Sequence, residues 1–309
     1  MTLSILIPVY RYDCTRLVTD LLEQCIALSL SLEIILGDDA SGQDYASIYD
    51  RLAAQHAEVW VYHAPKNIGA GLMRQELATK AKGFSLLYTD ADVLPTEGLI
   101  AAYMKARAEH PDAVVCGGFR YDERDCRADN RLRYHYGTQV EMRSLAQRIA
   151  EPYKSFIAMC FLAPRELVLS HPFPRMGMGY EDTYWGEMLR RSQLDVVHID
   201  APVVHRLKET DEAFLSTTER YLRNLHEHRD TFEGMSIKLL GYYRGLRRYH
   251  LARTIGRVAQ PLMYIIRQIL RRRPDRITLF QLYKLLYFCS LDLAQSSRWV
   301  EPNKAMDKS

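Results

Sequence analysis

The sequence predicts an α/β fold with parallel strands, followed by a helical C-terminal region. Short apolar runs alternate with helical patterns as far as Cys116, which is typical of a parallel β/α arrangement. Polar residues follow several of these runs, and ligands of such sheets bind beyond the carboxyl ends of the strands. After Phe214 the pattern is helical to the end of the chain, which predicts the C-terminal region.

The individual elements follow from the spacing of apolar residues. Thr15–Leu28, for example, places Leu17, Leu21 and Leu22 on one helical face. Gly117–Arg148 is polar and irregular, and we expect loops and short helices there. The expected strands are Ser4–Pro8, Leu32–Leu36, Val59–Tyr62, Phe84–Tyr88, Ala113–Cys116, Phe156–Leu162 and Val196–Ile199. The expected helices before the C-terminal region are Thr15–Leu28, Tyr45–His56, Ala70–Lys82, Gly98–His110 and Thr183–Ser192.

The composition is that of a globular protein with a basic tail. With 309 residues, 48% of them apolar, the chain is long enough for one large domain and a smaller appendage. The formal net charge is only +3, but Asp275 is the only acid between Lys238 and Lys284. Such a tail is typical of contact with an anionic surface. The bases of this stretch are Lys238, Arg244, Arg247, Arg248, Arg253, Arg257, Arg267, Arg271, Arg272, Arg273, Arg276 and Lys284.

Cysteine spacing and hydropathy exclude several classes of protein. The six cysteines have no C-x-x-C spacing, so we expect reduced thiols in the cytoplasm and neither a zinc site nor a redox motif. Pro8 interrupts the apolar N-terminal run, which is too short for a signal peptide. No uncharged apolar run reaches the ~20 residues that a membrane span needs. We therefore expect a protein that is neither secreted nor threaded through a bilayer.

Two expected strands end in paired carboxylates. Asp90 and Asp92 follow the first of them, and two hard anionic oxygens in this position suit Mg²⁺ or Mn²⁺. The alternative is a solvated Asp-x-Asp turn. Asp38 and Asp39 end the other strand, where they would accept hydrogen bonds from a base N–H or a ribose hydroxyl. The alternative there is a helix or turn cap.

Two basic side chains are candidates for contact with phosphate or metal. Asn67–Arg74 reads as a loop that turns into a helix, and Arg74 stands where a dinucleotide loop needs its third glycine, which excludes that loop. An arginine one turn into a helix suits a bidentate phosphate contact, whereas the alternative is a surface arginine. His205 is a candidate metal or diphosphate ligand, although a lone histidine is more often structural.

A glycine-rich segment, Gly177–Tyr180, precedes Glu181 and Asp182. If a helix begins near Asp182, its dipole favours the ionised carboxylate, which would act as a general base toward a sugar hydroxyl. Tyr184 and Trp185 follow, and their rings would offer faces on which a sugar lies. The alternative is a capping aspartate followed by core aromatics.

Together and in this order, these segments resemble family 2 glycosyltransferases with the GT-A fold, in which helices flank a mixed sheet. The resemblance covers about residues 1–230 and implies a nucleotide-binding half, 1–116, and an acceptor-binding half, 117–230, before a basic helical region, 231–309. The motifs that carry it are Ser4–Tyr10, Asp38–Ser41, Asn67–Gly69, Asp90–Asp92 and Glu181–Asp182.

The resemblance implies a role for each candidate residue. On the donor side these are Pro8, Val9 and Tyr10 at the nucleobase, Asp38, Asp39, Asn67 and Gly69 around it, Arg74 at the base or diphosphate, and Asp90 at the ribose or the metal. The metal ligands, for Mg²⁺ or Mn²⁺, are Asp92, Asp90 and His205. The catalytic base is Asp182 with Glu181 in support, and the acceptor contacts are Tyr180, Tyr184 and Trp185.

The implied reaction is a single displacement that inverts the anomeric carbon. The expected donor is a UDP-sugar, by family frequency, and transfer of a hexose or N-acetylhexosamine to a saccharide or lipid-linked saccharide would serve cell-surface polysaccharide synthesis. The chain departs from many relatives at Gln75, where they have asparagine. Two alternatives remain. One is a non-catalytic nucleotide-sugar-binding scaffold, and the other is a nucleotidyltransferase, which the lack of a Gly-rich, Lys-containing loop near the first strand disfavours.

The tail predicts an amphipathic helix over Arg257–Arg273. Val258, Leu262, Ile265, Ile266 and Ile269 fall on one face of it. Such a helix lies in membrane interfaces, and each basic residue near anionic lipid contributes about 1 kcal/mol. We therefore expect a cytoplasmic protein, peripheral on the inner face of the membrane. The alternative is a helical bundle packed on the catalytic domain, while the acidic sites elsewhere argue against nucleic acid as partner.

Overall fold

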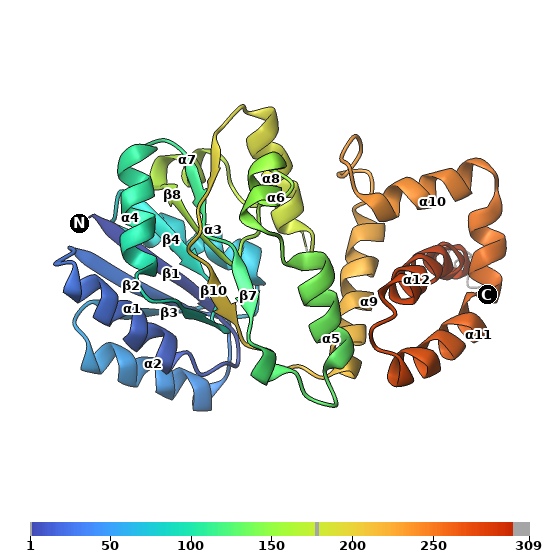
Figure 1. The fold of residues 1–309 in the computed structure, drawn as a ribbon, viewed down its shortest axis with the longest axis horizontal. Helices are drawn as coiled ribbons and strands as arrows, with labels where there is room; N and C mark the ends of the chain where they lie inside the picture. The colour runs from blue at the N-terminus through green and yellow to red at the C-terminus, as the bar shows by residue number, and fades with distance from the viewer. Residues whose placement is uncertain (1, 177–178, 299–309) are drawn as a thin grey trace, which may run out of the picture. The chain divides into compact units, whose positions relative to one another are not determined.

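The computed structural model describes residues 2–176 and 179–298, with side chains as far as residue 293 (Figure 1). Residues 177 and 178 of the expected glycine-rich segment lie outside this description. The chain divides into two compact units, Met1–Cys126 with Gly137–Lys208, and Arg127–Tyr136 with Glu209–Ser309. The division by contacts therefore falls at Lys208, whereas the sequence places the end of the catalytic domain at residue 230.

The first unit contains a seven-stranded mixed sheet. In the order of the sheet its strands are β3 (Val59–His63), β2 (Leu32–Asp38), β1 (Leu3–Val9), β4 (Ser85–Thr89), β8 (Cys160–Pro164), β6 (Val114–Cys116) and β9 (Val196–His198). The first four are mutually parallel, and β8 runs antiparallel to both of its neighbours. Because β1 and β2 pair residue by residue up to Val9 and Asp38, their carboxyl ends lie level at one edge.

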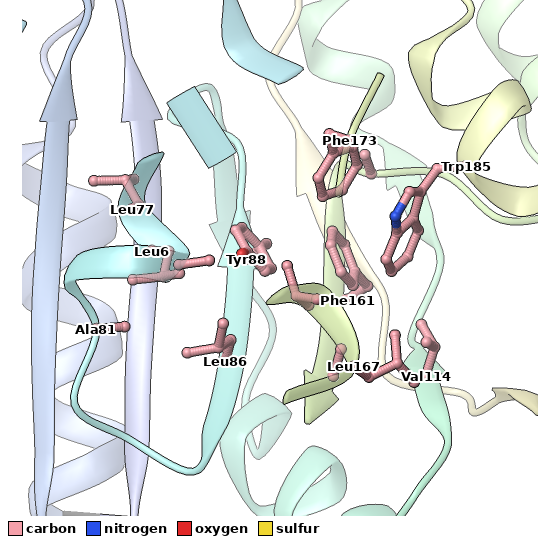
Figure 2. Close-up of a cluster of buried hydrophobic side chains, with 14 of the residues drawn as sticks. Leu6, Leu77, Ala81, Leu86, Tyr88, Val114, Phe161, Leu167, Phe173 and Trp185 are labelled. Carbon is pink, nitrogen blue, oxygen red and sulfur yellow. The ribbon is translucent and has the colours of Figure 1, made fainter. Parts of the chain in front are cut away.

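Helices cover the sheet because its strands are apolar on both faces. One face forms a buried cluster with α3 (Ala70–Lys80), α7 (Arg165–Ser170) and α8 (Glu181–Arg191). Figure 2 shows this cluster, in which Leu6, Tyr88 and Phe161 of neighbouring strands meet side chains such as Leu77 and Trp185. The remaining helices of this unit are α1 (Thr15–Ala27), α2 (Gln43–Gln55), α4 (Leu99–Glu109) and α6 (Leu145–Ala150), with the short turns η1 (Glu123–Asp125) and η2 (Gly137–Glu141).

A second, three-stranded sheet was not expected from the sequence. It consists of β5 (Val93–Pro95), β10 (Val203–His205) and β7 (Phe119–Tyr121), with β10 in the middle. Pro95 in β5, Arg120 in β7 and Pro202 directly before β10 interrupt the apolar runs, so these strands lack the signal that predicted the equally short β6 and β9. The sheet matters for the site because β10 pairs His205 with Val93 on one side, directly after Asp92, and with Tyr121 on the other.

The second unit is helical. It comprises α5 (Arg131–Tyr136), α9 (Asp211–Glu227), α10 (Lys238–Arg248), α11 (Leu251–Arg272) and α12 (Ile277–Arg298). Its core includes Phe214, Met263, Ile266 and Phe280. Ile266 is buried, whereas Val258, Leu262, Ile265 and Ile269, which the sequence places on the same face of the helix, are exposed. Within the described residues, none of these helices has an apolar stretch long enough to cross a bilayer.

Candidate active site

Asp39 organises the loop that leads into α3. Its two carboxylate oxygens accept hydrogen bonds from the backbone N–H groups of Ile68 (2.7 Å) and Gly69 (2.8 Å), and the amide of Asn67 donates to its carbonyl at 3.2 Å. Gly69 has a φ of 85°, a conformation that favours glycine. The structure thus brings together three of the predicted donor residues at the ends of β2 and its neighbouring loop.

Asp38 is occupied by other parts of the chain. It accepts a hydrogen bond from the backbone N–H of Ser41 at 2.9 Å, and its second oxygen lies 2.7 Å from Nδ1 of His63. Burial opposes protonation of His63, but Asp38 and Asp50 together raise the pKa of this imidazole. Asp38 therefore holds the end of β2 in place beside the predicted donor pocket.

At the end of β1, only Tyr10 offers an exposed ring. Its side chain is 47% exposed and lies under the guanidinium of Arg11, 5.1 Å from the ring centre. Pro8 and Val9 are buried in the sheet, and the carbonyl of Val9 accepts from the N–H of Asp39 at 2.9 Å. Of the three residues predicted to contact the nucleobase, Tyr10 is therefore the one with an accessible side chain.

Arg74 lies among carboxylates from two distant motifs. Its side chain is 5% exposed, and Nη2 donates to Oδ1 of Asp90 at 2.5 Å. Burial lowers the pKa of Arg74, but the charges of Asp90, Glu181 and Asp182 outweigh this effect and raise it. The guanidinium thus contacts a carboxylate of the chain itself and joins the end of β4 electrostatically to the start of α8.

Packing supports the same neighbourhood. A Cβ built on Gly71, in the first turn of α3, would lie 3.6 Å from Cγ of Glu181, so the N-terminal turns of α3 and α8 are in contact. Oε2 of Glu181 is buried and has no hydrogen-bond partner among the described residues. The predicted supporting carboxylate therefore sits at the junction of the two helices.

Asp182 lies in the first turn of α8, which begins one residue earlier at Glu181. Its Oδ1 accepts a hydrogen bond from the backbone N–H of Thr183 at 2.7 Å. Desolvation and the neighbouring charge of Glu181 raise the pKa of Asp182 to about 6, although Thr183 and Arg74 oppose the shift. A carboxylate with a higher proton affinity is a stronger base, which suits removal of a proton from a hydroxyl.

Asp92 and His205 meet through the small sheet. Nε2 of His205 lies 3.2 Å from Oδ2 of Asp92, and the backbone N–H of Arg206 donates to the carbonyl of Asp92 at 2.9 Å. Asp90 is near enough to feel both charges, and burial raises its pKa to about 6 against the effect of Arg74. Within the described residues no three His, Cys, Asp or Glu side chains are arranged as a complete metal site. Of the three predicted ligands, Asp92 and His205 are in direct contact, and Asp90 accepts a hydrogen bond from Arg74.

Sequence reasoning missed the residues that support His205. The ring of Tyr121 lies 5.3 Å from that of His205, and the Tyr121 hydroxyl donates to Oε2 of Glu141 at 2.7 Å. A Cβ on Gly137 would come within 2.6 Å of the Tyr121 ring, so only glycine fits there. The sequence carries no local signal for this contact, because Tyr121 and Gly137 belong to elements with no periodic pattern and meet only through tertiary packing.

The aromatic residues after Asp182 correct one expectation. Trp185 is 0% exposed, stacks on Phe173 with ring centres 4.7 Å apart, and donates its indole N–H to the carbonyl of His171 at 2.8 Å. Its ring has no free face for a sugar, so Trp185 is excluded from the acceptor site. Tyr180 and Tyr184 are partly exposed and remain candidates.

The shifted pKa of Asp182 leads to a prediction for pH dependence. A general base acts only when deprotonated, so activity should rise as pH increases through about 6 and then level off. Because Asp90 titrates in the same range, the apparent pKa belongs to the cluster as a whole. The measurement is a pH profile of kcat at saturating donor and metal. A profile that stays flat down to pH ~5 would contradict the assignment.

Comparison with known sequences finds one family and several relatives. Residues 4–168 match the model of the family described as glycosyl transferase family 2. Glycosyltransferase GlyG of Streptococcus pneumoniae serotype 4 is 26% identical over 125 residues, which are 40% of this chain and 41% of GlyG. The uncharacterized glycosyltransferase YfnE of Bacillus subtilis is 28% identical over 123 residues, 38% of this chain and 30% of YfnE. The matches thus span less than half of each relative.

Solved structures share the fold over most of the chain. The mannosyltransferase PcManGT from Pyrobaculum calidifontis, solved in complex with GDP-Man and Mn²⁺, has a TM-score of 0.62 and 17% identity, covering 97% of this chain and 88% of PcManGT. S. aureus TarS has a TM-score of 0.53 and 14% identity, covering 92% of this chain and 55% of TarS. The likeness confirms the expected GT-A class, a mixed sheet flanked by helices with a helical C-terminal region.

Proposed function

Because the chain belongs to glycosyl transferase family 2, we propose that it moves a sugar from a nucleoside-diphosphate donor to a hydroxyl acceptor with inversion, using Asp182 as base. One observation carries the proposal. Arg74 donates a hydrogen bond to Asp90, two residues before the predicted metal ligand Asp92, and its charge also attracts Asp182 at the start of α8. The predicted donor and acceptor motifs therefore lie close to the same guanidinium group.

The donor is proposed to be a nucleotide sugar, with UDP as the carrier of a hexose or N-acetylhexosamine. PcManGT was solved with GDP-Man and TarS with UDP-GlcNAc, so proteins of this fold take both nucleosides. In this chain the exposed ring of Tyr10 would stack on the base, beside the loop that Asp39 and Asn67 hold. The first measurement must therefore compare donors that differ in the nucleoside.

A divalent cation, Mg²⁺ or Mn²⁺, fits the pair Asp92 and His205. A carboxylate oxygen and an imidazole nitrogen 3.2 Å apart are the kind of donors that Mn²⁺ binds, and Mg²⁺ commonly takes one or two carboxylates together with substrate phosphates. The remaining positions would be filled by diphosphate oxygens. When bound there, the cation would neutralise the charge that develops on the departing diphosphate.

The chain's own residues then account for the remaining chemistry. Asp182 removes the proton of the acceptor hydroxyl, and the oxygen attacks the anomeric carbon on the face opposite the diphosphate. Arg74 donates a hydrogen bond to Asp90 and attracts the carboxylates of Glu181 and Asp182, and so holds the two ends of the site together. Tyr180 and Tyr184 are proposed to contact the acceptor, since both are partly exposed beside the base.

The acceptor is proposed to be a saccharide or lipid-linked saccharide of cell-surface polysaccharide synthesis, reached from the cytoplasmic face of the membrane. The concentration of bases between Lys238 and Lys284 supports a peripheral location.

The test is a panel of UDP-, GDP- and dTDP-sugars with Mg²⁺ or Mn²⁺, assayed for the released nucleotide. Release of nucleoside diphosphate is the expected result, and Asp92→Ala should weaken it at least tenfold at limiting metal by removing a ligand. Binding of a donor without turnover, even with lipid-linked acceptors, would favour a scaffold. Conversion of the donor and added pyrophosphate to a nucleoside triphosphate and a sugar 1-phosphate would favour a nucleotidyltransferase.

A further inference from the structure

Helix α11 exposes a stripe of large apolar side chains. Leu251, Val258, Leu262, Ile265 and Ile269 are 48, 49, 41, 52 and 38% exposed, respectively. At about 100° per residue, all five fall within a sector of roughly 60°. The neighbouring sector, which includes Ala259, Met263, Ile266 and Leu270, is the buried face of the helix. The stripe is therefore a second apolar face, additional to the face that the helical unit uses for its core.

Arginines lie on the other side of this stripe. Arg272 and Arg257 are exposed, and by helical position they lie about 50° and about 110° from the middle of the stripe, on the side away from the buried face. Within the described residues no carboxylate forms an ion pair with them. By contrast, Arg267 and Arg271 are paired with Glu212. The exposed half of α11 thus combines an apolar face with uncompensated positive charge.

We propose that this half of α11 binds the surface of an anionic phospholipid bilayer, with the helix axis parallel to the membrane. The stripe would enter the boundary between headgroups and acyl chains, and the arginines would reach phosphates beside it. From Leu251 to Ile269 the stripe extends over about 27 Å, since each helical residue adds 1.5 Å. Pro261 fits this surface because it faces outward and interrupts no packing with the core.

The charge distinguishes this occupant from a second copy of the chain. Two stripes packed face to face would place the flanking Arg257 and Arg272 of each copy along the contact, with no carboxylate of α11 to compensate them. An anionic bilayer offers both an apolar interior and negative charge. The proposal deepens the peripheral location given above, but vesicle binding is measured without donor or acceptor, so it stands or falls separately from the transferase activity.

The experiment is sedimentation of the full chain with vesicles. Phosphatidylcholine vesicles are compared with vesicles in which about one third of the lipid is phosphatidylglycerol, at low salt and at about 0.5 M NaCl. The expected result is binding to the anionic vesicles that weakens with salt. Leu262→Glu with Ile265→Glu should reduce vesicle affinity at least tenfold. Arg257→Glu with Arg272→Glu should reduce it about 30-fold or more, since each arginine contributes about fivefold.

Matched controls lie in the first unit. Phe84→Glu changes a side chain that is 78% exposed, and Arg51→Glu reverses an exposed charge, so neither should alter vesicle affinity. Circular dichroism melting of every variant excludes misfolding as the cause. Equal binding to neutral vesicles, retention of binding in both α11 variants, or a dimer by light scattering that Leu262→Glu dissociates would overturn the proposal.

Discussion

Asp182→Asn is expected to lower kcat by about 10³-fold and to leave donor affinity within a factor of about two, because a positioned general base contributes 10²–10⁴-fold. Asparagine has the same shape and still accepts the hydrogen bond from the Thr183 N–H, so α8 should keep its first turn. The measurements are single-turnover transfer rates and titration calorimetry with the donor.

Glu187→Gln is the matched control for this change. It makes the same substitution of amide for acid on the same helix, where the ion pairs of Glu187 within the described residues are with Arg190 and Arg191. Its kcat should stay within about twofold of wild type, since both arginines are more than half exposed and such screened pairs contribute little. If Asp182→Asn still transfers sugar at the wild-type rate, another group is the base, and Glu181 is the first to test.

Arg74→Met should destabilise the protein by about 3 kcal/mol and lower activity at neutral pH. Methionine fills much of the same volume, but Asp90, Glu181 and Asp182 lose the cation between them, and breaking a buried pair costs several kcal/mol. Since Arg74 lowers the pKa of Asp90 and Asp182, its removal should shift the acid limb of the pH profile upward. Urea unfolding and the pH profile of kcat measure the two effects.

Two other variants show whether the effect comes from the buried charge of Arg74 or from the loss of any arginine side chain. Arg74→Lys keeps a charge, although not the planar guanidinium, and should recover part of the stability. Arg165→Met removes an arginine whose partner, Glu166, is 88% exposed, so its effect should stay below about 1 kcal/mol. If Arg74→Met unfolds at the same urea concentration as wild type, the carboxylates do not depend on this cation.

The sequence was sufficient for the elements with a clear period and insufficient for those without one. The strands from Leu3 to Thr89 and the helices between them agree with expectation within a few residues, because apolar runs and helical periodicity define them locally. The strands β5, β7 and β10 were missed, since Pro95, Arg120 and Pro202 interrupt their apolar runs. His205 was consequently expected beyond a strand, although it ends β10.

Individual site residues show the same limit. Asp182 was assigned to a helix start from local signals, and α8 begins beside it. Trp185 lies only three residues further along, yet nothing local distinguishes a core indole from a sugar platform. The partner of Arg74 likewise depends on how β4, α3 and α8 come together, which is a property of tertiary packing.

The small sheet also has a consequence for the order of assembly. His205 completes its contact with Asp92 only after β10 has inserted between β5 and β7, strands that precede it by about a hundred residues. Contacts of such long sequence separation form late, because a long loop must close first. A nascent chain that has emerged only as far as residue 168 contains the whole family-matching segment but neither α8 nor β10. The growing polypeptide therefore lacks part of the proposed site until the ribosome has added β10.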